Sequence, residues 1–252
     1  MEATHYIIAI LAGFFAGIIN TLAGSGSLLT LPALLFLGLP AHLANGTNRV
    51  GILAQTFVGA LTLYRKGHIK VGYDAWYIVP TILGSGLGAW IALEIPEATM
   101  RTVIGVVMLL LLVVILFNYS ELLRPDNAPI SLSKRISSYP LLFVVGVYGG
   151  FIQLGVGIFT LAVLLLVLNM TFQHANALKN IMNFCLTLPA FLIFAWNGQI
   201  DWKIGIIIAI GQTAGAWVAA KYASENKSAA VWIRRLLVVM TVVSALKLFN
   251  VF

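Results

Sequence analysis

The feature that most constrains this chain is a succession of ten long apolar runs separated by short polar stretches. The runs cover 6–22, 27–38, 46–64, 75–93, 101–118, 140–153, 157–169, 177–196, 203–220 and 232–249. A helix needs about 20 apolar residues to cross a hydrocarbon core about 30 Å thick, and several runs approach that length. Only 9% of the residues are charged, against roughly a quarter in a soluble domain. The sequence therefore predicts an all-α polytopic membrane protein embedded in a lipid bilayer.

Charge and cysteine content argue against several other functions. The net charge is +7, but the basic residues are dispersed in loops and are not gathered with aromatic side chains, so we expect no nucleic-acid binding. The single cysteine, Cys185, excludes an intrachain disulfide and a Cys-rich metal site. The sequence contains no P-loop motif, and its apolar segments show no Ser-His-Asp or metal-ligand constellation. We therefore expect no enzymatic activity, no cofactor and no metal site.

The two halves of the chain are copies of one unit. The matched segments are 13–17 with 146–150, 24–26 with 155–157, 44–49 with 175–180, 67–69 with 198–200, and 84–90 with 211–217. The spacing between the copies changes only at two short deletions, and chance rarely preserves such a correspondence. We predict two five-segment transmembrane repeats, over residues 1–118 and 139–252, joined by a cytoplasmic linker over residues 119–138.

Basic residues indicate the orientation of the segments, because short loops rich in Lys and Arg remain in the cytoplasm. These residues gather in stretches 65–72, 119–138 and 221–235, whereas the opposite ends hold only Arg101, Lys203 and Lys247. If loop 65–72 is cytoplasmic, its counterpart 197–203 in the second copy lies on the other side. The repeats are then inverted in the membrane, and both termini are predicted to be extracytoplasmic.

Two of the apolar segments are shorter than a spanning helix requires. Segment 27–38 follows a glycine break from Gly24 to Gly26, and segment 157–169 follows the equivalent break that begins at Gly155 and includes Gly157. Short segments after such breaks are typical of broken or re-entrant helices. Their glycines can also supply backbone N–H groups to a bound anion.

Two basic residues stand apart from the loops. Arg49 and Lys179 both fall at the start of the third apolar segment of their repeat, whereas the other Lys and Arg lie in loops or at segment ends. A cation within hydrocarbon costs a few kcal/mol or more, so it faces a protein interior, a cavity or an opposite charge. The neighbouring sequence offers no carboxylate to either residue. Alternatively, both side chains snorkel to the membrane interface.

Polar residues accompany each cation on one helix face. In the first copy they are Asn45 and Asn48, and in the second they are Asn176, Asn180 and Asn183. An unpaired positive charge on a polar stripe near a helix N-terminus suits an oxyanion, and inverted repeats bring such stripes together near the midplane. The candidate substrate-binding residues are Arg49, Lys179, Asn45, Asn48, Asn176, Asn180, Asn183, Ser25, Gly24, Gly26, Gly155, Gly157, Asn20 and Gln153. Alternatively, the asparagines join helices without any ligand.

The chain also resembles a known family. The resemblance is carried by the duplicated Gly-rich opening, by Ala23-Gly24-Ser25-Gly26-Ser27, by Pro32 and by Ala44-Asn45-Gly46-Thr47-Asn48. With these features it resembles the sulfite exporter TauE/SafE family over nearly its whole length. The resemblance implies a permease of the bacterial or archaeal inner membrane for sulfur-containing anions such as sulfite, sulfoacetate or other organosulfonates, usually in the export direction. The second copy departs from the family pattern at Ala177-Leu178-Lys179, where a Gly-Thr-Ser-like stretch is common.

The predicted function is therefore secondary transport of a small sulfur-containing anion by alternating access between the repeats. A passive anion channel and a permease for a different small organic anion remain open, since both could use the same charges. The small-residue faces Gly84-xxx-Gly88 and Gly211-xxx-Gly215 are expected to bring helix backbones close together, and they leave a homodimer open.

Overall fold

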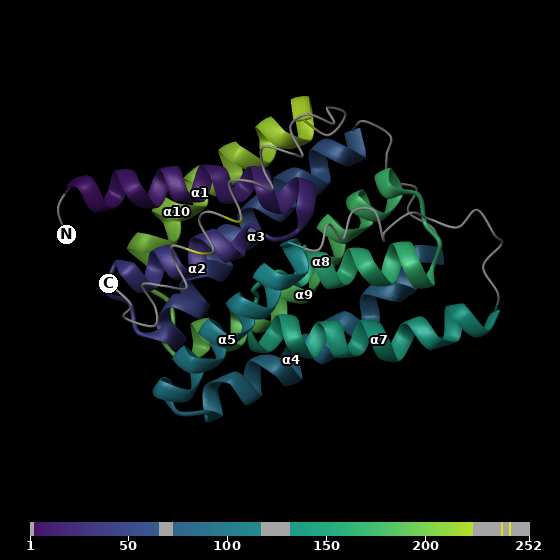
Figure 1. Ribbon diagram of the computed structural model, residues 1–252, viewed down its shortest axis with the longest axis horizontal. Coiled ribbons are helices and arrows are strands. Elements are labelled where there is room, and N and C mark those ends of the chain that lie inside the picture. The colour runs from purple at the N-terminus through teal and green to yellow at the C-terminus, as the bar shows by residue number, and fades with distance from the viewer. Residues whose placement is uncertain (1–2, 66–72, 117–131, 224–237, 239–241, 243–252) are drawn as a thin grey trace.

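The computed structural model describes residues 3–65, 73–116, 132–223, 238 and 242, and the described part of the chain forms helices and short connections without strands (Figure 1). The elements are α1 (Ala3–Ala23), α2 (Ser27–Phe36), α3 (Ala41–Arg65), η1 (Tyr73–Tyr77), α4 (Ile78–Glu94), α5 (Glu97–Leu116), α7 (Leu132–Phe151), α8 (Val156–Ala162), η2 (Val163–Val167), α9 (Phe172–Trp196), α10 (Trp202–Val218) and η3 (Ala219–Ala223). The all-α prediction is confirmed. The tenth predicted segment, 232–249, and most of linker 119–138 lie outside the described residues.

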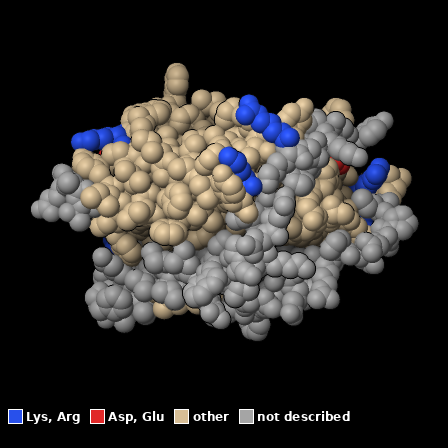
Figure 2. All heavy atoms as spheres, turned by 90° about the horizontal axis from the view of Figure 1, so that it is seen from above, with Lys and Arg blue, Asp and Glu red and all other residues tan. Residues whose placement is uncertain are grey.

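Length and composition suit these helices to a bilayer. Four described stretches are long and apolar enough to cross a membrane, namely Asp74–Glu94, Glu97–Ile115, Phe172–Trp196 and Trp202–Tyr222. Large apolar side chains such as Leu83, Leu110 and Ile210 point outward and are more than half exposed. Figure 2 shows few Lys, Arg, Asp or Glu side chains on the described part of the surface in that view. Lipid can cover such a surface, whereas its exposure to water would be energetically unfavourable.

The closest helix pairs join one repeat to the other. Helix α1 packs along α10, and α4 packs along α7. Glycines permit both contacts, because a Cβ atom at Gly88 would collide with the carbonyl oxygen of Val147, and one at Gly215 with that of Phe14. The predicted packing role of the small-residue faces is confirmed. The expectation of a homodimer depended on these same faces, and they are used within the chain.

The duplicated helices α3 and α9 run antiparallel beside each other. Phe57 in α3 contacts Phe184 in α9, with ring centroids 5.7 Å apart. Eight residues earlier in α3, the Arg49 guanidinium lies 4.6 Å from the ring centroid of Phe194, which is ten residues later in α9. A step forward along α3 is therefore a step backward along α9. The repeats are inverted, as predicted.

The two glycine breaks meet at the centre of the molecule. Gly24 and Gly155 adopt left-handed backbone conformations, with φ of 75° and 62°, and α2 and α8 begin just after them. A Cβ atom at Gly24 would lie 2.5 Å from the carbonyl carbon of Gly157, so the two backbones touch. Both short helices are largely buried, which places their N-terminal ends between the repeats.

We expect replacement of Gly88 by alanine to lower the melting temperature of the purified protein by several degrees, because the added methyl group must push α7 away from α4. Gly86 is the matched control, since a Cβ atom there meets nothing within 4 Å. Gly86→Ala should leave the melting temperature unchanged or raise it slightly, because alanine favours the helix. Equal losses in both variants would contradict the proposed packing role. Thermal unfolding in detergent, monitored by tryptophan fluorescence, measures both.

Candidate functional site

Arg49 and Lys179 lie in the interior of the protein. Both side chains are 0% exposed, and they are the two largest by volume among the fully buried side chains of the described residues. A snorkelling side chain would end at the headgroup layer, so this burial argues against the interface alternative. The described structure thus leaves two basic side chains in a low-dielectric interior, where a charge must have well-placed polar partners.

Arg49 caps the end of a helix from the other repeat. Its Nη1 donates to the carbonyl oxygen of Gly149 at 3.2 Å, and its Nη2 donates to that of Gly150 at 2.6 Å. Nη1 also donates to Oε1 of Gln153 at 3.0 Å. The two glycines lie in the last turn of α7, where carbonyl groups lack helical partners and the helix dipole is negative. The guanidinium is therefore held by helix-end carbonyls and a neutral amide.

Lys179 makes the equivalent contact in the opposite direction. Its Nζ donates to the carbonyl oxygens of Asn20 and Thr21, at 3.0 and 3.1 Å, in the last turn of α1. It also donates to Oδ1 of Asn176 at 2.7 Å. Each repeat thus places one cation on the first helix of the other repeat. Among the described residues, neither cation forms an ion pair with a carboxylate.

The helices that carry the two cations begin earlier than the apolar pattern indicates. Helix α3 begins at Ala41 and α9 at Phe172, so Arg49 and Lys179 lie about two turns inside them. The expectation that α3 and α9 present their own N-termini to a ligand is therefore wrong. The polar residues before each apolar run are still helical. They can be part of α3 and α9 because the fold buries their side chains against other helices. The helix N-termini at the site belong to α2 and α8.

Gln153 connects the parts of the site. Its Oε1 accepts from Arg49, its Nε2 donates to Oγ1 of Thr187, and its backbone oxygen accepts from Oγ of Ser27 at 2.6 Å. The Ser27 hydroxyl in turn accepts from the backbone N–H of Gly155, at 3.1 Å, where α8 begins. Gln153 and Ser27 together thereby link α2, α3, α8 and α9.

A small polar pocket lies beside this network. Its lining residues are Asn20, Gly24, Ser27, Ile52, Gln153, Val156, Gly157 and Asn183. It encloses about 180 Å³ of empty space, none of it wide enough for a water molecule. Arg49 and Lys179 do not line the pocket, but each contacts a residue that does, Gln153 and Asn20 respectively. The site is closed in this conformation.

The remaining predicted residues are buried around the same centre, with mixed roles. Asn45 donates from Nδ2 to the carbonyl oxygen of Phe151 at 2.8 Å, which joins α3 to α7. Asn180 donates to the carbonyl oxygen of Asn176 within α9. The helix-joining alternative accounts for Nδ2 of Asn45, whose Oδ1 stays unpaired, but not for Asn180, whose bond lies within its own helix. Ser25, Gly26 and Asn48 are also buried.

Three buried donor groups near the site have no partner among the described residues, whereas the unpaired Oδ1 atoms of Asn45 and Asn183 are acceptors. The three donors are Oγ of Ser25, Nδ2 of Asn48 and Nε of Arg49. The other atom of the Asn48 amide accepts from Oγ1 of Thr30 at 2.6 Å, which orients its free N–H₂ group. Each of the three groups can donate a hydrogen bond, and an oxyanion accepts such bonds. A buried group left unsatisfied requires an explanation, and a ligand is one.

Several residues of the site were not predicted. The carbonyl groups of Gly149 and Gly150 and the ring of Phe194 have no sequence pattern that marks them as partners of Arg49. Gln55 and Gln212 are buried as well, and each carries an unpaired amide oxygen. The rule that singled out Arg49, a polar side chain inside an apolar run, could have found both glutamines.

Comparison with known proteins gives one consistent result. The family model for sulfite exporter TauE/SafE matches residues 9–248. A probable membrane transporter protein, ORF9, of Sinorhizobium sp is 28% identical and covers 98% of this chain and 94% of its own length. A probable membrane transporter protein of Haemophilus influenzae is 31% identical over 85% of this chain and 84% of its own length. No solved structure matches the chain. Because the matched region covers nearly every described helix, the chain belongs to the sulfite exporter TauE/SafE family of membrane proteins.

Proposed function

We propose that this multi-pass membrane protein is a secondary transporter, working as an exporter, of a small sulfur-containing anion such as sulfite, sulfoacetate or another organosulfonate. The substrate would bind between the inverted repeats and cross by alternating access. The family and its relatives, which are named as probable membrane transporters, support a transport function. The family description, sulfite exporter, and the two buried basic side chains support this substrate class.

The observation that carries this proposal is the pair of buried cations held by neutral oxygens. Arg49 and Lys179 are both fully buried, and their described partners are carbonyl and amide oxygens. Two positive charges in a low-dielectric interior repel each other and lose their hydration. A small dianion or a sulfonate would offset both costs. The free donors of Ser25, Asn48 and Arg49 would then receive acceptors.

The closed pocket favours a carrier over a channel. A channel needs a continuous water-filled path, whereas the described pocket admits no water. A carrier passes through such closed states while one repeat rocks against the other. In this proposal Arg49 and Lys179 would exchange their carbonyl partners for the substrate as the repeats separate.

The proposal also includes the arrangement of the chain in the membrane. Repeats 1–118 and 139–252 would be joined by the cytoplasmic linker 119–138, with both termini outside the cytoplasm of a bacterial or archaeal cell. The distribution of Lys and Arg supports this orientation. Cysteine-accessibility labelling of single cysteines placed in loops 65–72 and 197–203 would test it, after replacement of Cys185.

Counterflow in proteoliposomes tests the proposed function directly. Vesicles loaded with unlabelled sulfite should accumulate labelled sulfite from the outside, and the rate should saturate with concentration. Competition by sulfoacetate, thiosulfate and taurine would rank the substrates, and a set of carboxylates would test the alternative of another organic anion. Large unitary currents without counterflow would indicate a channel. The absence of both would refute the proposal.

Replacement of Lys179 by methionine should reduce sulfite counterflow roughly tenfold to a hundredfold, because the variant keeps the length of the side chain and removes its charge. Lys179→Arg should retain more activity than Lys179→Met. Lys203→Met is the matched control, since Lys203 is an exposed lysine at the start of α10. Full counterflow in Lys179→Met, with loss in Arg49 variants, would show that the first repeat alone provides the binding charge.

A further inference from the structure

Two glutamines outside the Arg49 network lie in the interior without hydrogen-bond partners for their oxygens. Gln55 in α3 is 2% exposed, and Gln212 in α10 is 1% exposed. Oε1 of each side chain is buried and unpaired. Leaving one amide oxygen unsatisfied in an apolar interior is costly, and two on neighbouring helices are costlier still. A structure retains such groups when a ligand uses them.

The two glutamines belong to one small region between α3 and α10. Gly51 lies one helical turn before Gln55, so both occupy the same face of α3. A Cβ atom at Gly51 would lie 2.5 Å from Oε1 of Gln212, which shows that this amide rests directly on α3 at the glycine. Positions one turn apart are about 5–6 Å apart at Cβ. The Gln55 side chain is long enough to reach the space beside the Gln212 amide.

The equivalent helix pair, α4 with α9, makes the same contact without glutamines. In the internal alignment, Leu186 corresponds to Gln55 and Ser85 to Gln212. There the hydroxyl of Ser85 donates to the backbone oxygen of Leu186, so the contact is satisfied. Helices α4 and α9 therefore pack at this contact with a serine and a leucine. The fold itself does not require glutamines at this contact, and the glutamine pair between α3 and α10 needs another reason.

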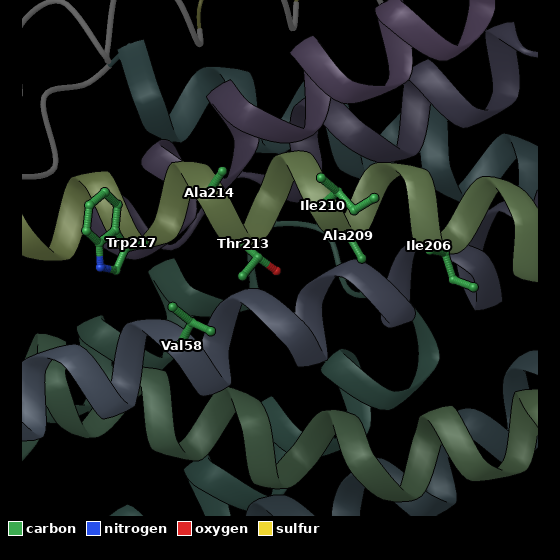
Figure 3. A pocket seen from close by; sticks show the side chains of 7 residues that line it. All are labelled: Val58, Ile206, Ala209, Ile210, Thr213, Ala214 and Trp217. Carbon is green, nitrogen blue, oxygen red and sulfur yellow. The ribbon is translucent and has the colours of Figure 1, made fainter.

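Partners for these amides cannot come from the outer side of the same helix pair. That side is an apolar groove of about 610 Å³, lined by Val58 of α3 and by Ile206, Ala209, Ile210, Thr213, Ala214 and Trp217 of α10 (Figure 3). The outward side chains Ile206 and Ile210 are more than half exposed, as expected of a surface covered by lipid. Lipid tails offer no hydrogen bonds. The ligand must reach the glutamines from the protein interior.

We propose that Gln55 and Gln212 form a site for a monovalent cation, with sodium as the ion to test, whose occupancy promotes binding of the anion. Amide oxygens are hard ligands, which suit cations of this kind, and water would complete the coordination. The unpaired atoms of both side chains are oxygens, so a cation fits the site better than a second anion. The role of the cation site rests on the proposed anion transport. Binding of the cation to the two glutamines does not.

Electrostatics would couple the two ions. Gln55 is six residues beyond Arg49 in α3, or about 9 Å along the axis. An empty anion site leaves Arg49 to repel the cation, whereas a bound anion attracts it. At about 10 Å and an effective dielectric constant of about 20, opposite unit charges change the affinity roughly tenfold. Linkage is reciprocal, so the cation would strengthen anion binding by the same factor.

The first experiment measures thermal unfolding of the purified protein in detergent, with sodium chloride replaced stepwise by choline chloride at constant ionic strength. Sodium should raise the melting temperature saturably in the absence of sulfite, and sulfite should lower the sodium midpoint about tenfold. The double variant Gln55→Leu/Gln212→Ser introduces the residues found at the equivalent contact between α9 and α4. It should lose the sodium response and melt higher than the unmodified protein in choline, because it carries no unsatisfied amides.

Controls separate this site from the anion site. Ser85→Ala removes the counterpart hydrogen bond and should lower the melting temperature without altering the sodium response. Sulfite binding in choline should persist in the double variant. A sodium response that survives in the double variant, or its absence from the unmodified protein, would overturn the cation site. A lower melting temperature of the double variant in choline would also overturn it, since the glutamines would then serve packing or bound water. None of these results depends on whether sulfite is transported.

Discussion

Replacing Arg49 by alanine is expected to reduce sulfite counterflow by about a hundredfold or more, the largest loss from a single side chain. Removal of a buried, hydrogen-bonded charge costs about 3 kcal/mol or more, and here it also removes the proposed substrate ligand. The carbonyl groups of Gly149 and Gly150 lose their donors at the same time. The variant should therefore bind sulfite weakly and melt at a lower temperature. Counterflow and sulfite-dependent thermal shift measure the two effects.

A second variant separates binding from stability. Arg49→Lys keeps the positive charge but replaces the planar guanidinium, with its unpaired Nε donor, by a single ammonium group, so we expect partial activity. Arg101→Ala, at an exposed position near the start of α5, should behave as the unmodified protein. If Arg49→Ala remained folded and transported sulfite normally, the guanidinium would be a helix cap only.

Replacing Gly157 by valine should have the largest effect on folding. Gly24 and Gly157 touch through their backbones, and neither backbone can move away as a flexible side chain could. Overpacking a fully buried backbone contact costs about 3 kcal/mol, and here it would separate the two repeats at their centre. We expect the variant to be recovered as aggregate or to melt at least several degrees lower.

The matched control for this variant is Gly86→Val, because Gly86 has open space where its side chain would begin. It should remain monodisperse in size-exclusion chromatography and should retain counterflow. A well-folded Gly157→Val variant with normal melting would show that the two glycine breaks do not need to touch.

Much of the architecture was predictable because a bilayer imposes strict chemistry on a sequence. Apolar runs of spanning length can hardly be anything but membrane helices, and the duplicated glycine motifs identify the repeats. The charge asymmetry of the loops predicted inversion, which the antiparallel contact of Phe57 with Phe184 confirms. Helix boundaries were less predictable. The starts of α3 and α9 were missed because their polar residues resemble a loop until the fold buries them.

The candidate site divides in the same way. Arg49 and Lys179 could be selected from the sequence, because a charge inside an apolar run is costly wherever it lies. Their carbonyl partners could not be selected, because every residue has a backbone carbonyl and only the packing of α7 and α1 leaves these few unpaired. Gln55 and Gln212 could be selected in the same way, but only the structure shows that the Gln212 amide lies against α3 at Gly51.

The sequence by itself determined that this chain is a helical membrane protein with two inverted copies of one unit and two isolated cations. It did so through hydropathy, repetition and charge, which are local properties of the chain. Only the tertiary structure decided that the glycine breaks touch and that each cation caps a helix of the other repeat. It also decided that the pocket between them is closed. These features depend on contacts between residues a hundred or more positions apart, which no local pattern encodes.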